Sequence, residues 1–137
     1  MHHAVVQILV VDDYEPFRRF LHRKLQSRPE LQIVSEASDG VQAVRKAEEL
    51  QPDLILLDIG LPKLNGIEAA RQIRKSAPQS RIIFVSQESS PDIVQEAFSL
   101  GTCGYVVKSK AEHDLLATVD AVLECRQLSG VDCEVGR

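Results

Sequence analysis

The 137-residue chain contains no tryptophan, one methionine and only 4% aromatic residues. Its hydrophobic residues, 44% of the chain, are therefore mainly valine, isoleucine and leucine, which are typical of buried strands covered by helices. The three cysteines, Cys103, Cys125 and Cys133, are an odd number and match no zinc-binding spacing, so we interpret them as reduced, structural thiols. The composition thus favours one aliphatic core over a metal- or disulfide-built domain.

The chain also lacks a long hydrophobic run and an excess of positive charge. Its apolar runs, such as Ile8 to Val11 and Leu54 to Leu57, are far shorter than the roughly 20 residues of a membrane-spanning helix. No signal-peptide pattern opens the sequence. With 16 Lys and Arg against 20 Asp and Glu, the net charge of -4 provides no basic field for nucleic acid. We therefore expect a cytoplasmic protein that binds neither membrane nor nucleic acid directly.

Short apolar runs alternate with segments of helical periodicity, which predicts a repeated strand and helix unit. The expected strands are 5–11, 31–35, 53–57, 81–85 and 105–107, and the expected helices are 15–27, 40–50, 67–76, 91–100 and 111–126. Helical crossovers imply a parallel sheet with helices on both faces, so the fold class is α/β, a doubly wound five-stranded sheet. We expect one domain over residues 5–126 and a tail or truncated linker over 127–137.

Polar residues follow four of the five predicted strands. They are Asp12 and Asp13, Asp58, Ser86 and Lys108. Each alone has an ordinary explanation as a helix cap, a turn residue, a backbone hydrogen-bond partner or a solvated charge. Ligands of doubly wound sheets bind beyond the carboxyl ends of the strands, where these side chains are expected to converge.

Three carboxylates at one sheet edge require a counter-charge. They would repel one another by up to about 4 kcal/mol per close pair at an effective dielectric near 20. Mg²⁺ prefers such hard oxygen ligands, and Lys108 adds a second cation. Three carboxylates, one divalent ion and one lysine carry no net formal charge, so the site can accept a phosphoryl group. Asp58, after the most apolar strand, is the deepest candidate to form an aspartyl phosphate.

Five stretches together resemble the receiver domains of two-component response regulators, over about residues 7–123. These stretches are Val-Asp-Asp-Tyr-Glu (11–15), Glu-Ala-Ser-Asp-Gly (36–40), Asp-Leu-Ile-Leu-Leu-Asp-Ile-Gly-Leu-Pro (53–62), Asn-Gly (65–66), and Ser86 with Gly-Tyr-Val-Val-Lys (104–108). The resemblance implies a flavodoxin-like sheet of strand order 2-1-3-4-5. It also implies that the partner is a sensor histidine kinase or a phosphotransfer protein.

The resemblance assigns the phosphoryl and metal sites residue by residue. Asp58 corresponds to the phosphoacceptor and Asp13 to a direct Mg²⁺ ligand. Asp12 corresponds to a second acid acting largely through water, and the backbone carbonyl of Gly60 to a further metal ligand.

Three more residues match the family's switch. Ser86 corresponds to a hydroxyl that bonds the phosphoryl oxygen, and Lys108 to the cation that pairs with it. Tyr105 corresponds to an aromatic residue that turns inward when Ser86 moves; the alternative for Tyr105 is an aromatic packed on the sheet edge.

Residues 64–74, 97–100 and 104–109 are similar to the NarL/FixJ branch, whose receivers usually precede a LuxR-type helix-turn-helix. The implied output is transcription regulation by such a domain, and the chain is then either cut from a longer regulator or a stand-alone receiver. Homodimerisation is likewise suggested by the family alone. Gln87 beside Ser86 is a departure from the family that concerns either access of the phosphodonor or the lifetime of the phosphoryl group. Gly60 is another, because it removes a side chain, two residues after the acceptor, that often tunes hydrolysis in the family.

Two alternatives to a phosphorylated switch stay open. One is a degenerate receiver that acts by docking only. The other, a magnesium-dependent phosphohydrolase, is disfavoured because the first strand is not followed by Asp-x-Asp, and we expect no enzyme activity. A basic face on helix 15–27, formed by Arg18, Arg19, Arg23 and Lys24, is either a kinase-docking surface or an ordinary solvated face.

Overall fold

The computed structural model describes residues 5–127. Its elements, in chain order, are β1 (Val6–Val11), α1 (Glu15–Leu25), β2 (Leu31–Ala37), α2 (Gly40–Leu50), β3 (Leu54–Leu57), α3 (Gly66–Ser76), β4 (Arg81–Ser86), α4 (Pro91–Ser99), β5 (Gly104–Val107), η1 (Lys108–Lys110) and α5 (Ala111–Gln127). Every predicted strand and helix is present. The largest differences are that α1 ends two residues early and β2 extends two residues further, while the 3₁₀ helix η1 was not predicted. The expected tail lies, from residue 128 onward, outside the described residues.

The five strands form one parallel sheet in the order β2-β1-β3-β4-β5, which confirms the predicted fold class. The register places Val11 beside Leu57, Leu57 beside Phe84, and Ser86 beside Val107. The carboxyl ends of β1, β3, β4 and β5 therefore lie along one edge of the sheet. The residues that follow these strands are brought to that edge by the backbone alone.

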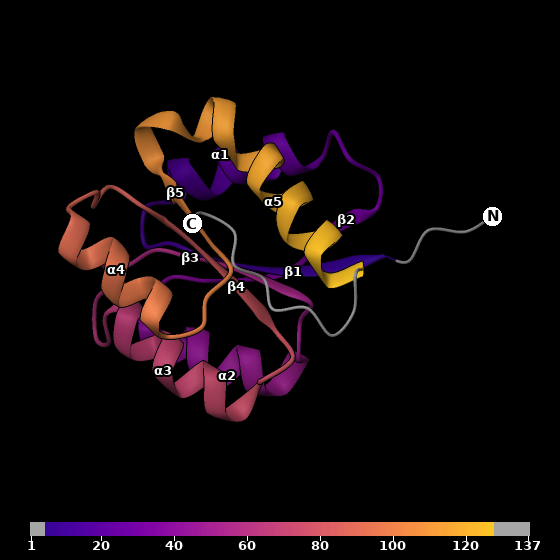
Figure 1. Cartoon of the computed structure of the whole chain (residues 1–137). Helices are drawn as coiled ribbons and strands as arrows, with labels where there is room; N and C mark the ends of the chain where they lie inside the picture. Colours follow the sequence, from indigo (N-terminus) through magenta and orange to yellow (C-terminus); the bar gives the residue numbers. More distant parts are fainter. Residues whose placement is uncertain (1–4, 128–137) are drawn as a thin grey trace.

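Helices cover both faces of the sheet, with α1 and α5 on one face and α2, α3 and α4 on the other (Figure 1). Each strand contributes alternate residues to the two layers. In β3, Leu54 and Leu56 pack under α1 and α5, whereas Ile55 and Leu57 pack under α2 and α3. All four are at most 1% exposed, as expected for a central parallel strand. This double-sided burial fixes the position of β3 and thus of Asp58 after it.

Side-chain caps begin the helices that cover the second face. Asp39 accepts a hydrogen bond from Gln42 N at α2, Asn65 from Glu68 N at α3, and Ser90 from Ile93 N at α4. Each cap satisfies a backbone N–H that the helix cannot pair itself. The caps fix where the chain turns from the sheet edge into a helix, and so fix the loops that surround the edge.

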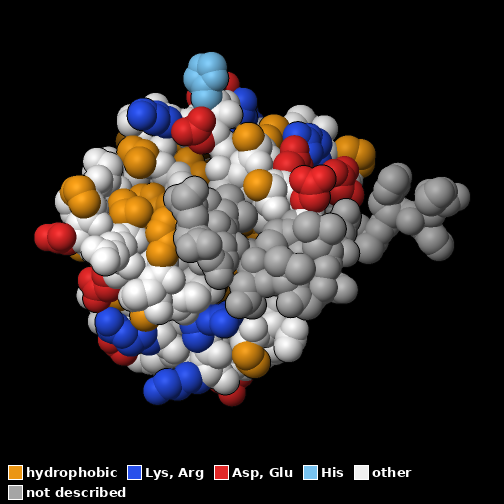
Figure 2. Space-filling view, viewed as in Figure 1, with side chains coloured by type: hydrophobic (Ala, Val, Ile, Leu, Met, Phe, Trp, Pro, Cys, Tyr) orange, Lys and Arg blue, Asp and Glu red, His pale blue; other side chains and the backbone are white. Residues whose placement is uncertain are grey.

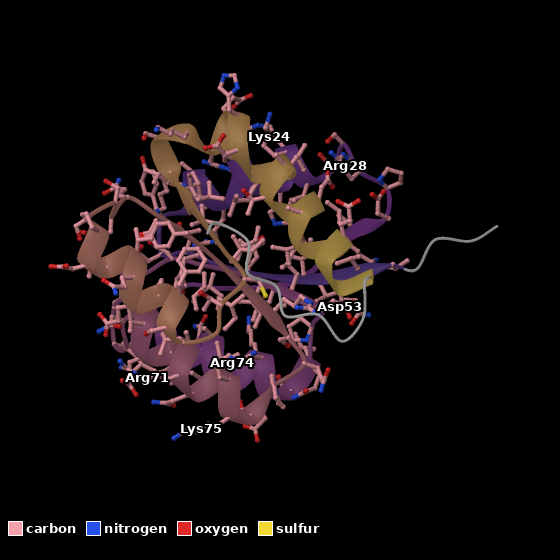
Figure 3. All side chains as sticks on the ribbon, in the orientation of Figure 1. Lys24, Arg28, Asp53, Arg71, Arg74 and Lys75 are labelled. Atoms are coloured by element: carbon pink, nitrogen blue, oxygen red, sulfur yellow. The ribbon has the colours of Figure 1, made fainter. Side chains whose placement is uncertain are left out.

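The surface carries charges of both signs. Figure 2 shows basic and acidic side chains interspersed over the face in view. Lys24 of α1 pairs with Glu112 of α5 at 2.8 Å, and Arg28, in the loop after α1, pairs with Asp120 of α5 at 2.7 Å; Lys24 and Arg28 are labelled in Figure 3. Within residues 5–127, no helix has both the length and the hydrophobicity needed to cross a bilayer.

Candidate functional site

Three carboxylates meet at the sheet edge as the sequence predicted. Asp12 follows β1 and Asp58 follows the neighbouring β3, and one oxygen from each of Asp12, Asp13 and Asp58 lies within 4.8 Å of the others. Asp12 is 1% exposed and Asp58 6%, whereas Asp13 is exposed. The cluster therefore has a buried floor and one acid at its rim.

Lys108, the first residue after β5, supplies a cation to this cluster. Its Nζ lies 2.7 Å from Asp12 Oδ2 and 3.3 Å from Asp58 Oδ2. It also lies 4.7 Å from the ring centre of Phe17, within range of a cation–π contact. Burial alone would lower the pKa of Lys108, but the hydrogen bond to Asp12 and the charges of both aspartates outweigh it and raise that pKa. Lys108 therefore stays charged at neutral pH.

The partners of Asp12 only partly offset the cost of burying its negative charge. Burial raises the pKa of Asp12, although Lys108 and the backbone N–H of Tyr14, 2.9 Å from Oδ1, both favour its ionised form. The pKa values of Asp12 and Lys108 are thus both raised although the two groups share a hydrogen bond. Desolvation is the larger effect at the carboxylate, and attraction to the aspartates is the larger effect at the amine. The cluster as described still holds more negative than positive charge, which favours a second cation.

The donor set fits a magnesium ion. Mg²⁺ prefers oxygen ligands about 2.1 Å away in an octahedron, which puts neighbouring ligands about 3 to 4 Å apart. The separation of up to 4.8 Å among the three carboxylate oxygens needs only a small contraction to meet this requirement. Asp12, Asp13 and Asp58 are therefore able to hold the ion, and the exposed position of Asp13 leaves room for water ligands.

Ser86 and Tyr105 are linked through one short segment. Ser86, the last residue of β4, is 2% exposed, and its Oγ accepts a hydrogen bond from Glu88 N at 3.3 Å. The hydroxyl of half-buried Tyr105 donates to the carbonyl oxygen of Glu88 at 2.7 Å, and its ring packs against Phe84. Burial, the largest effect, raises the pKa of Tyr105, while a hydrogen bond with Ser86 opposes that rise. A displacement of Ser86 would therefore disturb Tyr105 through Glu88.

The loop between Asp58 and α3 packs closely against the backbone of two glycines, which leaves no space for a side chain at either. A Cβ on Gly66 would lie 2.0 Å from the backbone oxygen of Asp58, and one on Gly40 would lie 1.8 Å from the backbone oxygen of Leu64. A Cβ on Gly60 would meet nothing within 4 Å. The sequence identified these glycines as turn or motif residues, but only the tertiary contacts show which two cannot carry a side chain.

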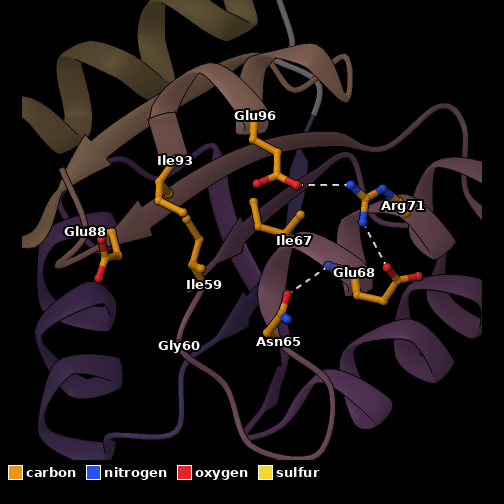
Figure 4. A pocket seen from close by; sticks show the side chains of 9 residues that line it. All are labelled: Ile59, Gly60, Asn65, Ile67, Glu68, Arg71, Glu88, Ile93 and Glu96. Carbon is orange, nitrogen blue, oxygen red and sulfur yellow. Dashed lines mark hydrogen bonds and ion pairs between the residues drawn. The ribbon is translucent and has the colours of Figure 1, made fainter. Parts of the chain in front are cut away.

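A pocket of about 440 Å³ opens beside this loop, between α3 and α4 (Figure 4). Its lining residues are Ile59, Gly60, Asn65, Ile67, Glu68, Arg71, Glu88, Ile93 and Glu96. Arg71 spans its rim with ion pairs to Glu68 at 2.9 Å and Glu96 at 3.1 Å. Gly60 and Glu88 thus belong both to this pocket and to the surroundings of the acidic cluster.

Two of the four residues of the predicted basic face of α1 are engaged by acids of neighbouring elements. Arg18 is not solvated, because its side chain is 18% exposed and bonds to Glu36 and to the backbone of Asp12. Lys24 pairs with Glu112 on α5. Arg19 and Arg23 are exposed. Helical periodicity placed all four on one side of the helix, but it could not show that β2 and α5 supply acids along the edges of that side.

Comparison with known proteins gives consistent matches. A family model described as the response regulator receiver domain matches residues 8–120. The nitrate/nitrite response regulator protein NarL of Escherichia coli (strain K12) is 36% identical over 109 residues, which cover 80% of this chain and 50% of NarL. A protein-glutamate methylesterase/protein-glutamine glutaminase of Thermotoga maritima is 43% identical over 106 residues, covering 76% of this chain and 30% of that protein.

A solved structure gives a similar result. The crystal structure of a two-component response regulator of the LuxR family from Aurantimonas sp. SI85-9A1 superposes with a TM-score of 0.83 at 33% identity, covering 88% of this chain and 86% of that chain. The chain spans about half the length of NarL and about a third of the methylesterase. These two relatives have different activities, so the shared part does not by itself specify an output.

Proposed function

The chain belongs to the family of response regulator receiver domains, and from this premise we propose that Asp58 accepts a phosphoryl group from a histidine kinase or phosphotransfer protein. The predicted resemblance to the NarL/FixJ branch is confirmed by the match to NarL and to the LuxR-family structure. The phosphorylated chain then controls an output by a change of conformation.

The observation that supports this proposal is the setting of Asp58. It follows the central strand β3, lies within 4.8 Å of two other acids, and has the amine of Lys108 3.3 Å away. Phosphoryl transfer needs mainly alignment and charge neutralisation from a protein. A buried carboxylate beside a fixed cation and a metal-binding pair of acids supplies both.

The transfer itself is a displacement at phosphorus. An oxygen of the Asp58 carboxylate attacks the phosphorus of the donor's phosphoimidazole, a P–O bond forms as the P–N bond breaks, and the electron pair leaves with the imidazole nitrogen. Lys108, now paired with Asp12 and Asp58, is placed to bind an oxygen of the incoming phosphoryl group. Its raised pKa keeps it charged throughout.

Receiver domains bind Mg²⁺ in an acidic pocket, and the three clustered aspartates form such a pocket here. We propose that Asp13 and Asp58 contact the ion directly, that Asp12 acts largely through water, and that the carbonyl of Gly60 completes the protein ligands. When bound, Mg²⁺ neutralises charge that develops on the phosphoryl oxygens. The chain's own contribution is to hold these oxygens on one side of Asp58.

The switch proposal rests on the Ser86–Glu88–Tyr105 contacts. A phosphoryl oxygen on Asp58 offers the hydroxyl of Ser86 a charged acceptor, which forms a stronger hydrogen bond than a neutral one. If Ser86 turns toward it, the bond from Glu88 N is lost and the carbonyl that holds Tyr105 is displaced. Repacking would then spread over α4, β5 and α5.

The wider role is also a proposal. NarL and the LuxR-family structure are response regulators, which favours control of transcription by a separate output domain. We propose that this chain does so in the cytoplasm, without enzyme activity and without contacting nucleic acid itself, and that it forms homodimers.

The kinase-docking proposal now rests on Arg19 and Arg23 alone. A double charge reversal, R19E/R23E, should slow transfer from a cognate kinase but not from acetyl phosphate; equal slowing of both reactions would contradict docking.

The central test is phosphorylation by a small donor. The chain is incubated with acetyl phosphate and Mg²⁺, and intact mass is measured for the wild type and for D58N. We expect one hydroxylamine-sensitive phosphoryl adduct that depends on both Asp58 and Mg²⁺. No adduct, or an equal adduct on D58N, would contradict the proposal, and sustained multiple turnover on phosphate esters would favour a hydrolase instead.

A further inference from the structure

Arg18 connects the acidic cluster to a second polar group outside it. Its Nη1 donates to the backbone carbonyl oxygen of Asp12 at 2.6 Å, and its Nε donates to Glu36 Oε1 at 2.7 Å. The other oxygen of Glu36 contacts His22, one turn further along α1. Glu36 is thus held from two sides and in turn fixes the plane of the Arg18 guanidinium.

The atom that Arg18 binds belongs to the peptide bond between Asp12 and Asp13. That bond is planar, so fixing the Asp12 carbonyl also fixes the N–H of Asp13 and its Cα, the atom from which the Asp13 side chain extends. The carboxylate of Asp12 is held separately, by Tyr14 N and Lys108. The carboxylate of exposed Asp13 makes no hydrogen bond or ion pair with another residue in the described range 5–127. Its orientation therefore depends on its backbone.

We infer that Arg18 is a positioning residue for the divalent cation: it holds the Asp12–Asp13 peptide so that the Asp13 carboxylate faces Asp58. This inference rests on the proposed metal site. Groups that orient metal ligands from outside commonly change metal affinity 10- to 100-fold when they are removed. Arg18 does so through the ligand's backbone, and Glu36 supports it from β2.

The sign of the effect separates positioning from simple electrostatics. Arg18 is a cation near the metal site, so Coulomb's law alone predicts that its removal would strengthen Mg²⁺ binding. Loss of positioning predicts the opposite. Arg19 is a matched control, since it is the next residue of α1, carries the same charge and is exposed, and its side chain has no hydrogen bond or ion pair within the described part of the chain.

The experiment is a Mg²⁺ titration by calorimetry at fixed ionic strength on the wild type, R18A, R18K and R19A. We expect R18A to bind about tenfold more weakly, R18K to fall between R18A and the wild type because one amine cannot serve both acceptors, and R19A to bind equally or slightly more tightly. Without metal, the backbone amide resonance of Asp13 should shift in R18A but not in R19A.

Each outcome has a distinct meaning. Binding by R18A that equals or exceeds that of R19A would overturn the role of Arg18 while leaving the proposed function intact. Absence of Mg²⁺ binding by the wild type would overturn the metal site itself. If R18A does not fold, as judged by thermal unfolding, R18K is decisive, and wild-type affinity with an unmoved Asp13 amide in R18K would contradict the inference.

Discussion

Lys108 and Asp12 form an ion pair of 2.7 Å in which the carboxylate is 1% exposed and the pKa of each partner is raised. The pair stabilises the charged form of Lys108, whereas burial disfavours the charged form of Asp12 more than Lys108 favours it. The three carboxylates of the site therefore outnumber its one lysine. This imbalance favours the binding of a second cation.

Replacing Lys108 tests this imbalance directly. K108M keeps an apolar side chain over Phe17 but leaves two buried carboxylates without their cation, so we expect the unfolding free energy in EDTA to fall by about 3 kcal/mol. Mg²⁺ should then raise Tm more than in the wild type, because no competing cation is present. The control is K110M, an exposed position in η1. Equal stability of the two variants in EDTA would contradict this account.

Gly66 and Gly60 offer a paired test of the loop after Asp58. G66A places a Cβ where the backbone oxygen of Asp58 lies, so we expect a loss of about 3 kcal/mol in denaturant unfolding and slower phosphorylation. G60A adds a Cβ into open space and should change stability by no more than about 0.5 kcal/mol. Alanine is otherwise a better helix former than glycine, so a stabilised G66A would refute the close approach.

Glu36 should contribute to stability in a pH-dependent way. Burial opposes its charge, but His22 and Arg18 outweigh burial and lower the pKa of Glu36 below its ordinary value of 4.5. A lowered folded-state pKa stabilises above the unfolded value and loses that contribution as the pH falls through the folded value. E36Q should therefore be less stable than the wild type at pH 7, by about 0.5 to 1 kcal/mol given the partial exposure.

The difference between E36Q and the wild type is measured by urea unfolding from pH 7 down to pH 3. It should shrink once the pH passes below 4.5, since protonated glutamic acid and glutamine are both neutral. A difference that grows on acidification would show that the sign is wrong.

Tyr105 can report on the switch because the sequence contains two tyrosines and no tryptophan. In Y14F, which alters an exposed residue, all tyrosine fluorescence comes from Tyr105. We expect the emission to change on phosphorylation, as the hydroxyl loses the Glu88 carbonyl, and to stay constant in Y14F/D58N. Y14F/S86A should be phosphorylated with a much smaller change. A full response in that variant would remove Ser86 from the switch.

The sequence alone determined the alternation of strands and helices, and therefore the parallel sheet. Apolar runs such as Leu54 to Leu57 are long enough for a buried strand but too short for a buried helix, and the segments between them have helical periodicity. Once the strands are parallel, the residues after them must share an edge. The convergence of Asp12, Asp13, Asp58, Ser86 and Lys108 was predictable for this reason.

The contacts between elements distant in the sequence could not be predicted and became known from the folded structure. Periodicity placed Arg18 on a basic helix face, but in the fold it bonds to Glu36 of β2. The sequence indicated only a turn at Gly66, but in the fold this residue packs against the backbone of Asp58. Periodicity specifies which face of an element is apolar, because burial along one element depends on local spacing. It does not specify which polar groups meet across elements, because those pairs depend on how the helices are docked on the sheet.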